Sequence, residues 1–458
     1  MSYSEFLNSK FALTQAQGFA PPKMPDSFFP MQSDLTGWAI KRGRAAIFAD
    51  TGLGKSRMQI AWADAVVKHT QSDAMIFAPL AVAQQTVKEG ASIGINITYC
   101  REESDLRPGI NISNYERMHK FDSTQFKGVV LDESSIIKHH DAKTFRTLTE
   151  MYGTTPYRFC ATATPAPNDW TEFGTHAEFL GICSRAEMLA EFFTHDGGET
   201  SIWRLKGHAR ELFWKWVASW AAFIRRPSDL GYDDSLYNLP PLKITEHVVK
   251  TSMPTNGMLF AMEAQTLSER RDARRFSLAD RVEECAAIVN NDKQSWVVWC
   301  DLNAEGDALK LSIPGAVEIR GSDDADVKEK RLIDFASGKI RVLITKPSIA
   351  GFGLNWQHCA RMAFVGVTDS FEAYYQAVRR CWRFGQTKEV NVHVFSSEAE
   401  GAVVANLKRK ERDVIEMGEQ LSAETREAVY ASIKSAQRHT NVYNPAQTVK
   451  APAFLEAA

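Results

Sequence analysis

A glycine-rich loop between an apolar run and a helical pattern constrains the fold of this chain most strongly. Residues 49–56 read ADTGLGKS; they follow the β-prone run 45–49 and precede the helical pattern SRMQIAWADAVV. Loop glycines let backbone amides face an anion, and the start of the following helix adds its positive dipole end. The sequence therefore predicts a phosphate-binding loop in a parallel α/β sheet, and a glycine turn that only caps a helix is the weaker alternative.

Each position of this loop has an expected role. Lys55 can reach the terminal phosphates of a nucleotide, and the hydroxyl of Ser56 can ligate Mg²⁺. The remaining cradle residues are predicted to present their backbone to the phosphates: Thr51, Gly52, Leu53 and Gly54.

Two acidic residues stand at the end of another apolar run, VVLDESS at residues 129–135. Strand ends within a parallel sheet are otherwise apolar, so this pair is unusual for a purely structural strand. We expect Asp132 to hold Mg²⁺, directly or through water, and Glu133 to orient and deprotonate an attacking water. Alone the pattern is weak, but a phosphate loop in the same lobe strengthens it.

A pair of arginines lies far along the chain, where residues 376–386 read QAVRRCWRFGQ. The pattern predicts a helix that enters from SFEAYY and from which Arg380 and Arg383 project on one side, three residues apart. Two arginines presented together suit a γ-phosphate whose charge is redistributing. Taken alone, a salt-bridged surface helix is the alternative.

Short β-prone runs alternate with helical patterns in two stretches of the chain, as is typical of parallel α/β folds. Between these stretches, residues 185–236 are rich in Trp and Phe at helical spacing and predict a helical insertion, whose tryptophans are expected in the core. The predicted strands cover residues 45–49, 75–78, 128–131, 158–161, 296–299, 317–319, 342–344, 362–365 and 390–395.

A chain of 458 residues is too long for one compact core, so two lobes are expected. The LPP stretch at residues 239–241 marks a boundary. The predicted division is a partly disordered N-terminal lead at 1–26, an ATP-binding lobe at 27–184, a helical insertion and linker at 185–290, a second lobe at 291–400, and a helical tail with a flexible terminus at 401–458.

Composition excludes several other classes of protein. No apolar run approaches the ~20 residues needed to cross a bilayer, and the N-terminus lacks a secretory layout. Seven scattered cysteines without a CxxC pair argue against a zinc site or a disulfide framework. These features predict a cytoplasmic protein without a membrane partner. The formal net charge of −2 neither favours nor excludes nucleic-acid binding, which local basic clusters can provide.

The order of these motifs resembles that of superfamily 2 helicases, and their detail is similar to the Swi/Snf-like branch, over roughly residues 28–395. ADTGLGKS resembles the family's ADEMGLGKT, and residues 376–386 match its QAxxRxxRxGQ. By that match Arg380 and Arg383 are the arginine-finger candidates, and Arg379 is not. FPMQ at residues 29–32 is similar to the family's adenine-recognising motif, which implies that Gln32 reads the base. DESS departs from the family's DEAH, so the coupling provided by that histidine is absent or reassigned.

Five further segments resemble family motifs that contact nucleic acid or couple it to hydrolysis: FAPL, ISNYE, ATATPAPN, EIRGS and AGFGLN. The last of these implies that Gly353 lies near the nucleotide. The resemblance implies nucleic-acid contacts at Pro79, Asn114, Tyr115, Thr162, Arg320, Gly321, Ser322, Gly351 and Asn355.

The resemblance implies two RecA-like lobes that hydrolyse ATP with Mg²⁺ between them and move along DNA. Duplex DNA is favoured over single strands and RNA, and no protein partner is indicated. The compact chain suits a bacterial or phage protein in a bacterial cytoplasm. Three alternatives stay open at this point: a strand-separating DNA or RNA helicase, a non-motor P-loop enzyme such as a small-molecule kinase, and a binding protein that uses ATP as a switch.

Overall fold

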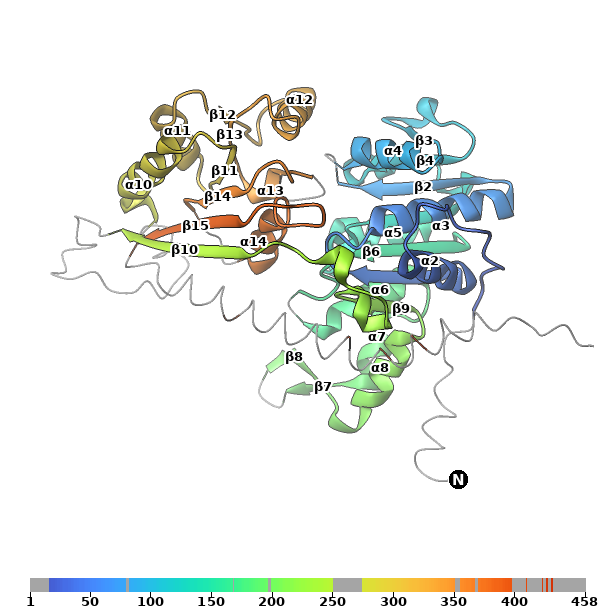
Figure 1. Ribbon diagram of the computed structural model, residues 1–458. Coiled ribbons are helices and arrows are strands. Elements are labelled where there is room, and N and C mark those ends of the chain that lie inside the picture. Colours follow the sequence, from blue (N-terminus) through green and yellow to red (C-terminus); the bar gives the residue numbers. More distant parts are fainter. Residues whose placement is uncertain are drawn as a thin grey trace, which may run out of the picture.

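The computed structural model describes residues 16–79, 82–167, 169–196, 199–249, 274–350, 355–366 and 370–397, together with residues 409, 422, 426 and 430. The predicted helical tail and most of the predicted N-terminal lead lie outside these residues. Two sheets dominate the described part of the chain, and Figure 1 shows them side by side.

The first sheet is entirely parallel and has the strand order β3-β4-β2-β5-β6-β1-β9. All four strands predicted for this lobe are present. The strands are β1 (Arg44–Ala49), β2 (Asp73–Ala78), β3 (Ile97–Tyr99), β4 (Ile110–Asn114), β5 (Phe126–Asp132), β6 (Tyr157–Thr162) and β9 (Ala221–Ile224).

Helices cover both faces of this sheet, which explains why its strands read as continuous apolar runs. Successive strand residues point to opposite faces, so Ile47 joins one buried cluster and Phe48 the other. The first cluster packs against α2 (Pro30–Arg42), α3 (Lys55–Thr70) and α4 (Ala83–Ser92). The second packs against α5 (Lys143–Tyr152), α6 (Phe173–Leu180), α7 (Arg185–Phe192) and α8 (Arg210–Ala218).

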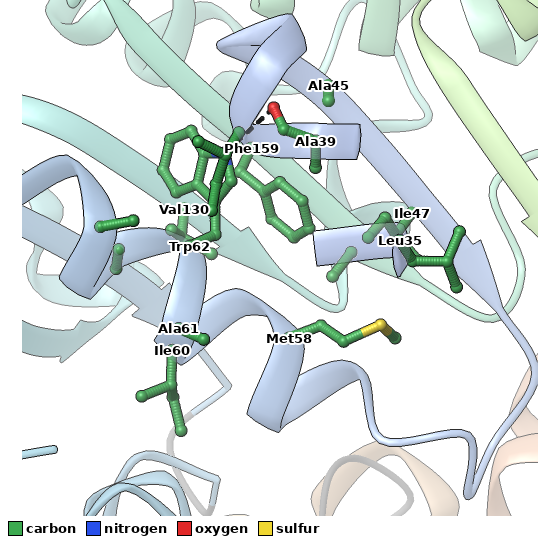
Figure 2. Close-up of a cluster of buried hydrophobic side chains, with 14 of the residues drawn as sticks. Leu35, Ala39, Ala45, Ile47, Met58, Ile60, Ala61, Trp62, Val130 and Phe159 are labelled. Carbon is green, nitrogen blue, oxygen red and sulfur yellow. Dashed lines mark hydrogen bonds between the residues drawn. The ribbon is translucent and has the colours of Figure 1, made fainter. Parts of the chain in front are cut away.

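Trp62 ties α3 to its neighbours within the first cluster (Figure 2). Its ring lies 5.3 Å from that of Phe159 on β6, measured between centroids, and its Nε1 donates a hydrogen bond of 3.4 Å to the carbonyl of Ala39 on α2. These contacts fix the helix that follows the phosphate loop against the sheet.

The helical insertion expected over residues 185–236 is only partly helical. After α7 the chain forms an antiparallel pair, β7 (Phe193–Asp196) and β8 (Glu199–Leu205), and after α8 it forms β9, the edge strand of the first sheet. The apolar AAFI of β9 pairs with β1. This pairing with the sheet makes residues 221–224 a strand, although the helical pattern of the preceding residues continues into them. The core placement expected for the tryptophans is confirmed at positions 214, 216 and 220, and Trp203 is partly buried.

The second sheet is also parallel, in the order β10-β15-β14-β11-β13-β12. The five predicted strands are present, and β10 is an additional edge strand from the expected linker. The strands are β10 (Leu242–Val249), β11 (Trp296–Trp299), β12 (Val317–Glu318), β13 (Val342–Thr345), β14 (Arg361–Phe364) and β15 (Val390–Ser397).

Helices again cover both faces of this second sheet. On one face lie α10 (Leu278–Asn291) and α11 (Asn303–Ser312), and on the other α12 (Ala325–Ala336), α13 (Pro347–Ala350) and α14 (Phe371–Val378). Two parallel α/β lobes, as predicted, are therefore confirmed. Within the described residues, no helix combines the length and apolarity needed to cross a membrane.

Candidate active site between the two lobes

The phosphate loop and the acidic pair lie at the same edge of the first sheet. β6 separates β1 from β5, and all three strands are parallel, so their carboxyl ends point the same way. The loop follows β1, Asp132 ends β5, and Thr162 ends β6 between them. The edge where parallel strands end is where α/β sheets hold their ligands.

The backbone of the phosphate loop has the shape that its glycines allow. Gly52 has a φ of 92° and Gly54 a φ of 88°, values that residues other than glycine rarely adopt. Gln32 braces the loop from α2: its Nε2 donates to the carbonyl of Leu53 over 3.1 Å, and its Oε1 accepts from the amide of Phe29 over 3.2 Å. A Cβ at Gly54 would lie 2.2 Å from Nε2 of Gln32.

Replacing Gly54 by alanine is therefore expected to lower nucleotide affinity by at least roughly tenfold, because the methyl group strains the loop and displaces Gln32. Gly94 offers a matched control, since its φ is 76° but no atom lies within 4 Å of the added Cβ. Titration calorimetry with a non-hydrolysable ATP analogue should show the loss for Gly54→Ala and not for Gly94→Ala. Equal affinities in both variants would contradict the proposed use of this loop.

Lys55 sits at the start of α3 with its ammonium group turned back toward β1. Its Nζ donates to the carbonyl of Ala49 over 2.8 Å and to that of Asp50 over 3.4 Å. Burial lowers the pKa of this lysine, while the carboxylates of Glu133, Asp50 and Asp132 act in the opposite direction. A half-buried cation at the mouth of the loop suits the binding of a polyanion.

The acidic pair lies beside this lysine. Burial, followed by the charge of Glu133, raises the pKa of Asp132 to about 7, and Lys55 opposes this rise. A divalent cation would favour the ionised form, and the Asp132 carboxylate with the Ser56 hydroxyl is the oxygen donor set that Mg²⁺ prefers. The residues therefore fit the ion.

Backbone and side-chain contacts hold Glu133 in place at the end of β5. It adopts a left-handed conformation with a φ of 51°, a strained geometry that often marks functional residues. Thr162 Oγ1 donates to Glu133 Oε2 over 3.4 Å, and the hydroxyl of Tyr115 donates to the carbonyl of Asp132 over 2.7 Å. Glu133 also lines a cavity between the lobes, so water can reach its carboxylate.

The arginine pair follows a helix rather than standing on it. The helix α14 ends at Val378, so the expectation that Arg380 and Arg383 project from one helical face is wrong. The turns after the helix place Arg380 in a buried position, where its Nε and Nη2 donate to the carbonyl and the side-chain Oε1 of Gln376 over 3.0 and 2.9 Å.

Both arginines nevertheless lie within electrostatic reach of acidic residues of the first lobe. Burial lowers the pKa of Arg380 to about 10, and Glu133 opposes this change. Burial also lowers the pKa of Arg383, opposed by Glu89 and Glu133, and Arg383 in turn helps to lower the pKa of Lys55. Such charge effects weaken with distance. The loop also touches the arginine segment directly, because a Cβ at Gly52 would lie 2.7 Å from that of Phe384.

Gln386, the last residue of the arginine motif, organises this turn. Its Nε2 donates to three backbone carbonyls at 2.9 to 3.2 Å, and its Oε1 accepts from the amides of Thr387 and Lys388. The glutamine thus fixes the segment that carries both arginines.

The predicted nucleic-acid contacts of the first lobe fall into two groups. Pro79 and Tyr115 line a cavity of about 520 Å³ that also includes second-lobe residues on α12 and α13. Asn114 and Thr162 are buried and have local partners: Asn114 Oδ1 accepts from the amide of Arg117 over 3.1 Å, and Thr162 contacts Glu133.

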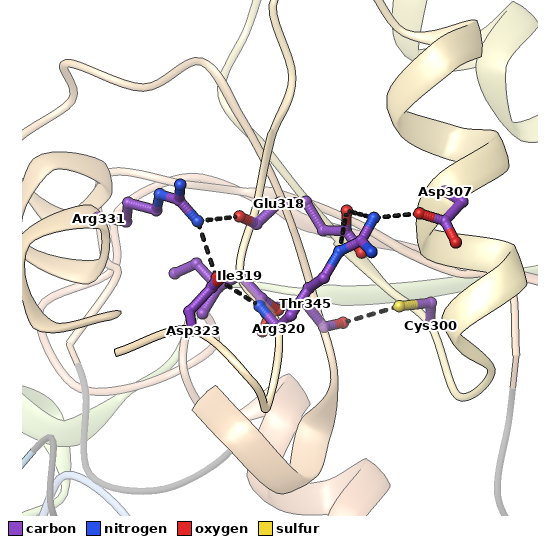
Figure 3. A network of polar contacts seen from close by, with 8 residues as sticks. All are labelled: Cys300, Asp307, Glu318, Ile319, Arg320, Asp323, Arg331 and Thr345. Atoms are coloured by element: carbon purple, nitrogen blue, oxygen red, sulfur yellow. Dashed lines mark hydrogen bonds and ion pairs between the residues drawn. The ribbon is translucent and has the colours of Figure 1, made fainter. Parts of the chain in front are cut away.

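In the second lobe, Arg320 is held by acidic neighbours (Figure 3). Its Nε donates to Glu318 Oε2 over 2.9 Å, and its Nη2 contacts both Glu318 and Asp307. Its side chain is 39% exposed, yet the two carboxylates offset its charge. This weakens the electrostatic attraction of Arg320 for a phosphate. The carbonyl of Gly321 accepts from Lys328, and Ser322 is exposed.

Two of the predicted residues on the AGFGLN loop, Gly351 and Gly353, lie outside the described residues. Asn355, at the end of that loop, accepts a 3.3 Å hydrogen bond from the amide of Gln357 through its Oδ1.

The sequence reasoning missed the residues that join the lobes. Asp50 contacts Tyr375 and Arg379 across the interface, and Lys138 forms an ion pair with Glu372. The available signals were Asp50, a charged residue at the start of the phosphate loop, and Arg379, a charged residue beside the arginine pair. Only the packing of the lobes brings the two together.

Two family models match this chain. Residues 37–196 match the model of the SNF2-related domain, and residues 282–385 match that of the helicase conserved C-terminal domain. No match was found among curated proteins. A search of solved structures found the Sulfolobus solfataricus SWI2/SNF2 ATPase core in complex with dsDNA, at 17% identity and a TM-score of 0.42, covering 91% of this chain and 98% of that one.

The two matched domains together span more than half of the chain and contain the elements of the site described above. The phosphate loop and the acidic pair lie within the first, and Arg380 and Arg383 within the second. Two RecA-like lobes with these motifs in this order make an ATPase of superfamily 2, and the chain belongs to its Swi/Snf-like branch.

Proposed function

We propose that this protein hydrolyses ATP, with Mg²⁺, in the pocket between its lobes and uses the reaction to move along DNA, with duplex DNA favoured. The observation that supports this most directly is the position of Arg380 and Arg383. They come from the second lobe, yet they lie within electrostatic reach of Glu133 in the first. A site divided in this way is complete only when the lobes are together, which links chemistry to lobe movement.

The first lobe supplies nucleotide binding and the attacking water. Ser56 and Asp132 would hold the ion, and bound Mg²⁺ neutralises charge on the terminal phosphates. Glu133 orients the water and accepts its proton. The side-chain amide of Gln32 uses one N–H for Leu53 and one acceptor lone pair for Phe29. A second N–H and a second lone pair remain, and together they suit the donor–acceptor edge of adenine.

The second lobe supplies charge to the transition state. Arg380 and Arg383 meet the γ-phosphoryl group as negative charge shifts onto its oxygens, and such preorganised cations act most strongly away from bulk water. Opening of the lobes withdraws both arginines and releases products. Alternate closing and opening then changes the distance between the DNA-backbone contacts of the first lobe and those of the second.

One titration tests the proposal: the ATPase rate against duplex DNA, single-stranded DNA and RNA at fixed salt. We expect the largest stimulation with duplex DNA, little dependence on base sequence, and a half-saturating concentration that rises steeply with salt because contacts are mainly to phosphates. Hydrolysis unaffected by any polynucleotide would favour a non-motor P-loop enzyme instead.

Two further assays separate translocation from unwinding. Displacement of a triplex-forming strand reports movement along intact duplex, and a fluorescent fork substrate reports strand separation. We expect ATP-dependent triplex displacement without fork opening. Fork opening at a comparable rate would assign the protein as a strand-separating helicase.

A further inference from the structure

Three side chains meet between the lobes at the start of the phosphate loop. Asp50 Oδ1 accepts two hydrogen bonds of 2.6 Å, one from the backbone amide of Thr51 and one from the hydroxyl of Tyr375. Asp50 Oδ2 accepts from Arg379 Nη2 over 2.5 Å. Arg379 Nε donates to the Tyr375 hydroxyl over 3.1 Å, which closes the triangle.

This triangle is well shielded from water. The side chain of Arg379 is 8% exposed and that of Asp50 is 21% exposed. The guanidinium carbon of Arg379 lies 4.6 Å from the ring centre of Trp382 and 5.2 Å from that of Tyr375, so aromatic faces cover the cation as well. Charged hydrogen bonds in such surroundings are stronger than those of exposed pairs.

Asp50 connects this triangle to the catalytic lysine. Its carbonyl accepts from Lys55 Nζ, its amide donates to the carbonyl of Ile224 on β9, and its carboxylate holds the amide of Thr51 inside the loop. On the other side, Arg379 directly precedes Arg380. The contact therefore joins the backbone of the phosphate loop to the segment that carries both finger arginines.

The motif match does not account for this contact, because position 379 is unspecified in QAxxRxxRxGQ. We propose that Asp50, Tyr375 and Arg379 form an interlobe clasp that holds the phosphate loop in register with Arg380 and Arg383 when the lobes close. Arg379 is then a positioning residue, and the inference rests on the proposed function because it concerns the same site.

The clasp acts on the balance between open and closed lobes. The two hydrogen bonds that cross from Asp50 to Tyr375 and to Arg379 exist only when the lobes are together. On opening both charges return to water, so these two contacts add their free energy to the closed state. The helix α14, which lies on the side of the second lobe that faces the first (Figure 1), has a second contact at its other end, where Glu372 pairs with Lys138 and accepts from Thr164 over 3.5 Å. Loss of the clasp should thus loosen closure without removing every contact between the lobes.

A double-mutant cycle tests this directly. Arg379→Gln removes the cation, and Asp50→Asn removes the anion while keeping a side-chain oxygen for Thr51 and Tyr375. Closure is measured by fluorescence energy transfer between cysteines introduced at two exposed positions, Lys88 on α4 and Leu311 on α11, with Cys183→Ser as background because the other cysteines are buried.

With a saturating non-hydrolysable ATP analogue, we expect each single variant to lower the closed-to-open ratio by roughly tenfold, and the double variant to lower it no further. In steady state the KM for ATP should rise by a similar factor, with a much smaller fall in kcat, since Arg380 and Arg383 still complete the site once closure occurs.

Arg274 and Asp301 provide a matched control within the second lobe. This pair joins over 2.7 Å with side chains 7% and 30% exposed, close to the values of the clasp. The corresponding cycle, Arg274→Gln with Asp301→Asn, should leave the closed-to-open ratio unchanged.

The outcomes separate the clasp from the proposed function. If the unmodified protein hydrolyses ATP in response to DNA but Arg379→Gln closes normally, or if the two single effects add, the clasp is wrong. If the unmodified protein shows no such hydrolysis, the proposed function fails, whereas the energy-transfer measurement still reports on the clasp because it needs no turnover.

Discussion

Lys55→Ala is expected to abolish DNA-stimulated ATP hydrolysis, with turnover falling by at least roughly 10³-fold. Lys55 is half-buried at the mouth of the phosphate loop, where the negative charges of Glu133, Asp50 and Asp132 act on its ammonium group. Without it, these acids repel the incoming triphosphate and no cation remains at that point of the loop. Affinity for ATP and turnover should therefore fall together, as measured by calorimetry and by phosphate release.

Lys68 provides the control for this result. It lies on the same helix, α3, but its side chain is 70% exposed and pairs with Asp64 at the surface. Lys68→Ala should keep both affinity and turnover. Near-normal hydrolysis by Lys55→Ala would remove the assignment of residues 49–56 as the catalytic phosphate loop.

Glu133→Gln separates binding from chemistry in the same pocket. The amide keeps the size of the side chain but accepts no proton from water, so turnover should fall by roughly 10²–10⁴-fold. ATP binding should be retained, since Lys55 is untouched and one like charge beside Asp132 is removed. A variant that binds the nucleotide and fails to cleave it is the expected phenotype.

The strands that carry this site could be predicted from the sequence, and the physical reason is their burial. β1 and most of β5 are buried on both faces, so they contain the apolar runs 45–49 and 128–131, and the candidate site residues follow each run. The two edge strands β9 and β10 were missed for different reasons. In β10 most residues are exposed or half-buried, whereas β9 is an apolar run that directly follows a helix of similar composition, so neither strand was predicted.

Contacts between the lobes could not be predicted from sequence. Arg379 and Asp50 are separated by 329 positions, and neither residue type is unusual at its own place in the chain. The helical spacing of Arg380 and Arg383 gave the wrong local structure, because α14 ends before them, although the charge of Glu133 in the first lobe acts on both. Their orientation follows from the turn held by Gln386 and from the packing of α14 on the first lobe.

Arg383→Ala is expected to spare ATP binding while lowering turnover by roughly 10³-fold, the lower end of what an arginine finger contributes. Its charge helps to lower the pKa of Lys55, so its removal lets that pKa rise and keeps the lysine protonated for ground-state binding. The transition state, in contrast, loses a cation that comes from the opposite lobe. Binding and catalysis should therefore separate in this variant.

Single-turnover hydrolysis and the dissociation constant of an ATP analogue test this separation. Arg361→Ala is the control, because Arg361 pairs with Asp292 within the second lobe and has no contact with the phosphate loop in the described residues. Arg383→Lys should restore only part of the rate, since an ammonium group keeps the charge but loses the planar fork of donors. A large loss of affinity with little loss of rate in Arg383→Ala would mean that the residue binds the ground state, and the finger would then have to be Arg380 alone.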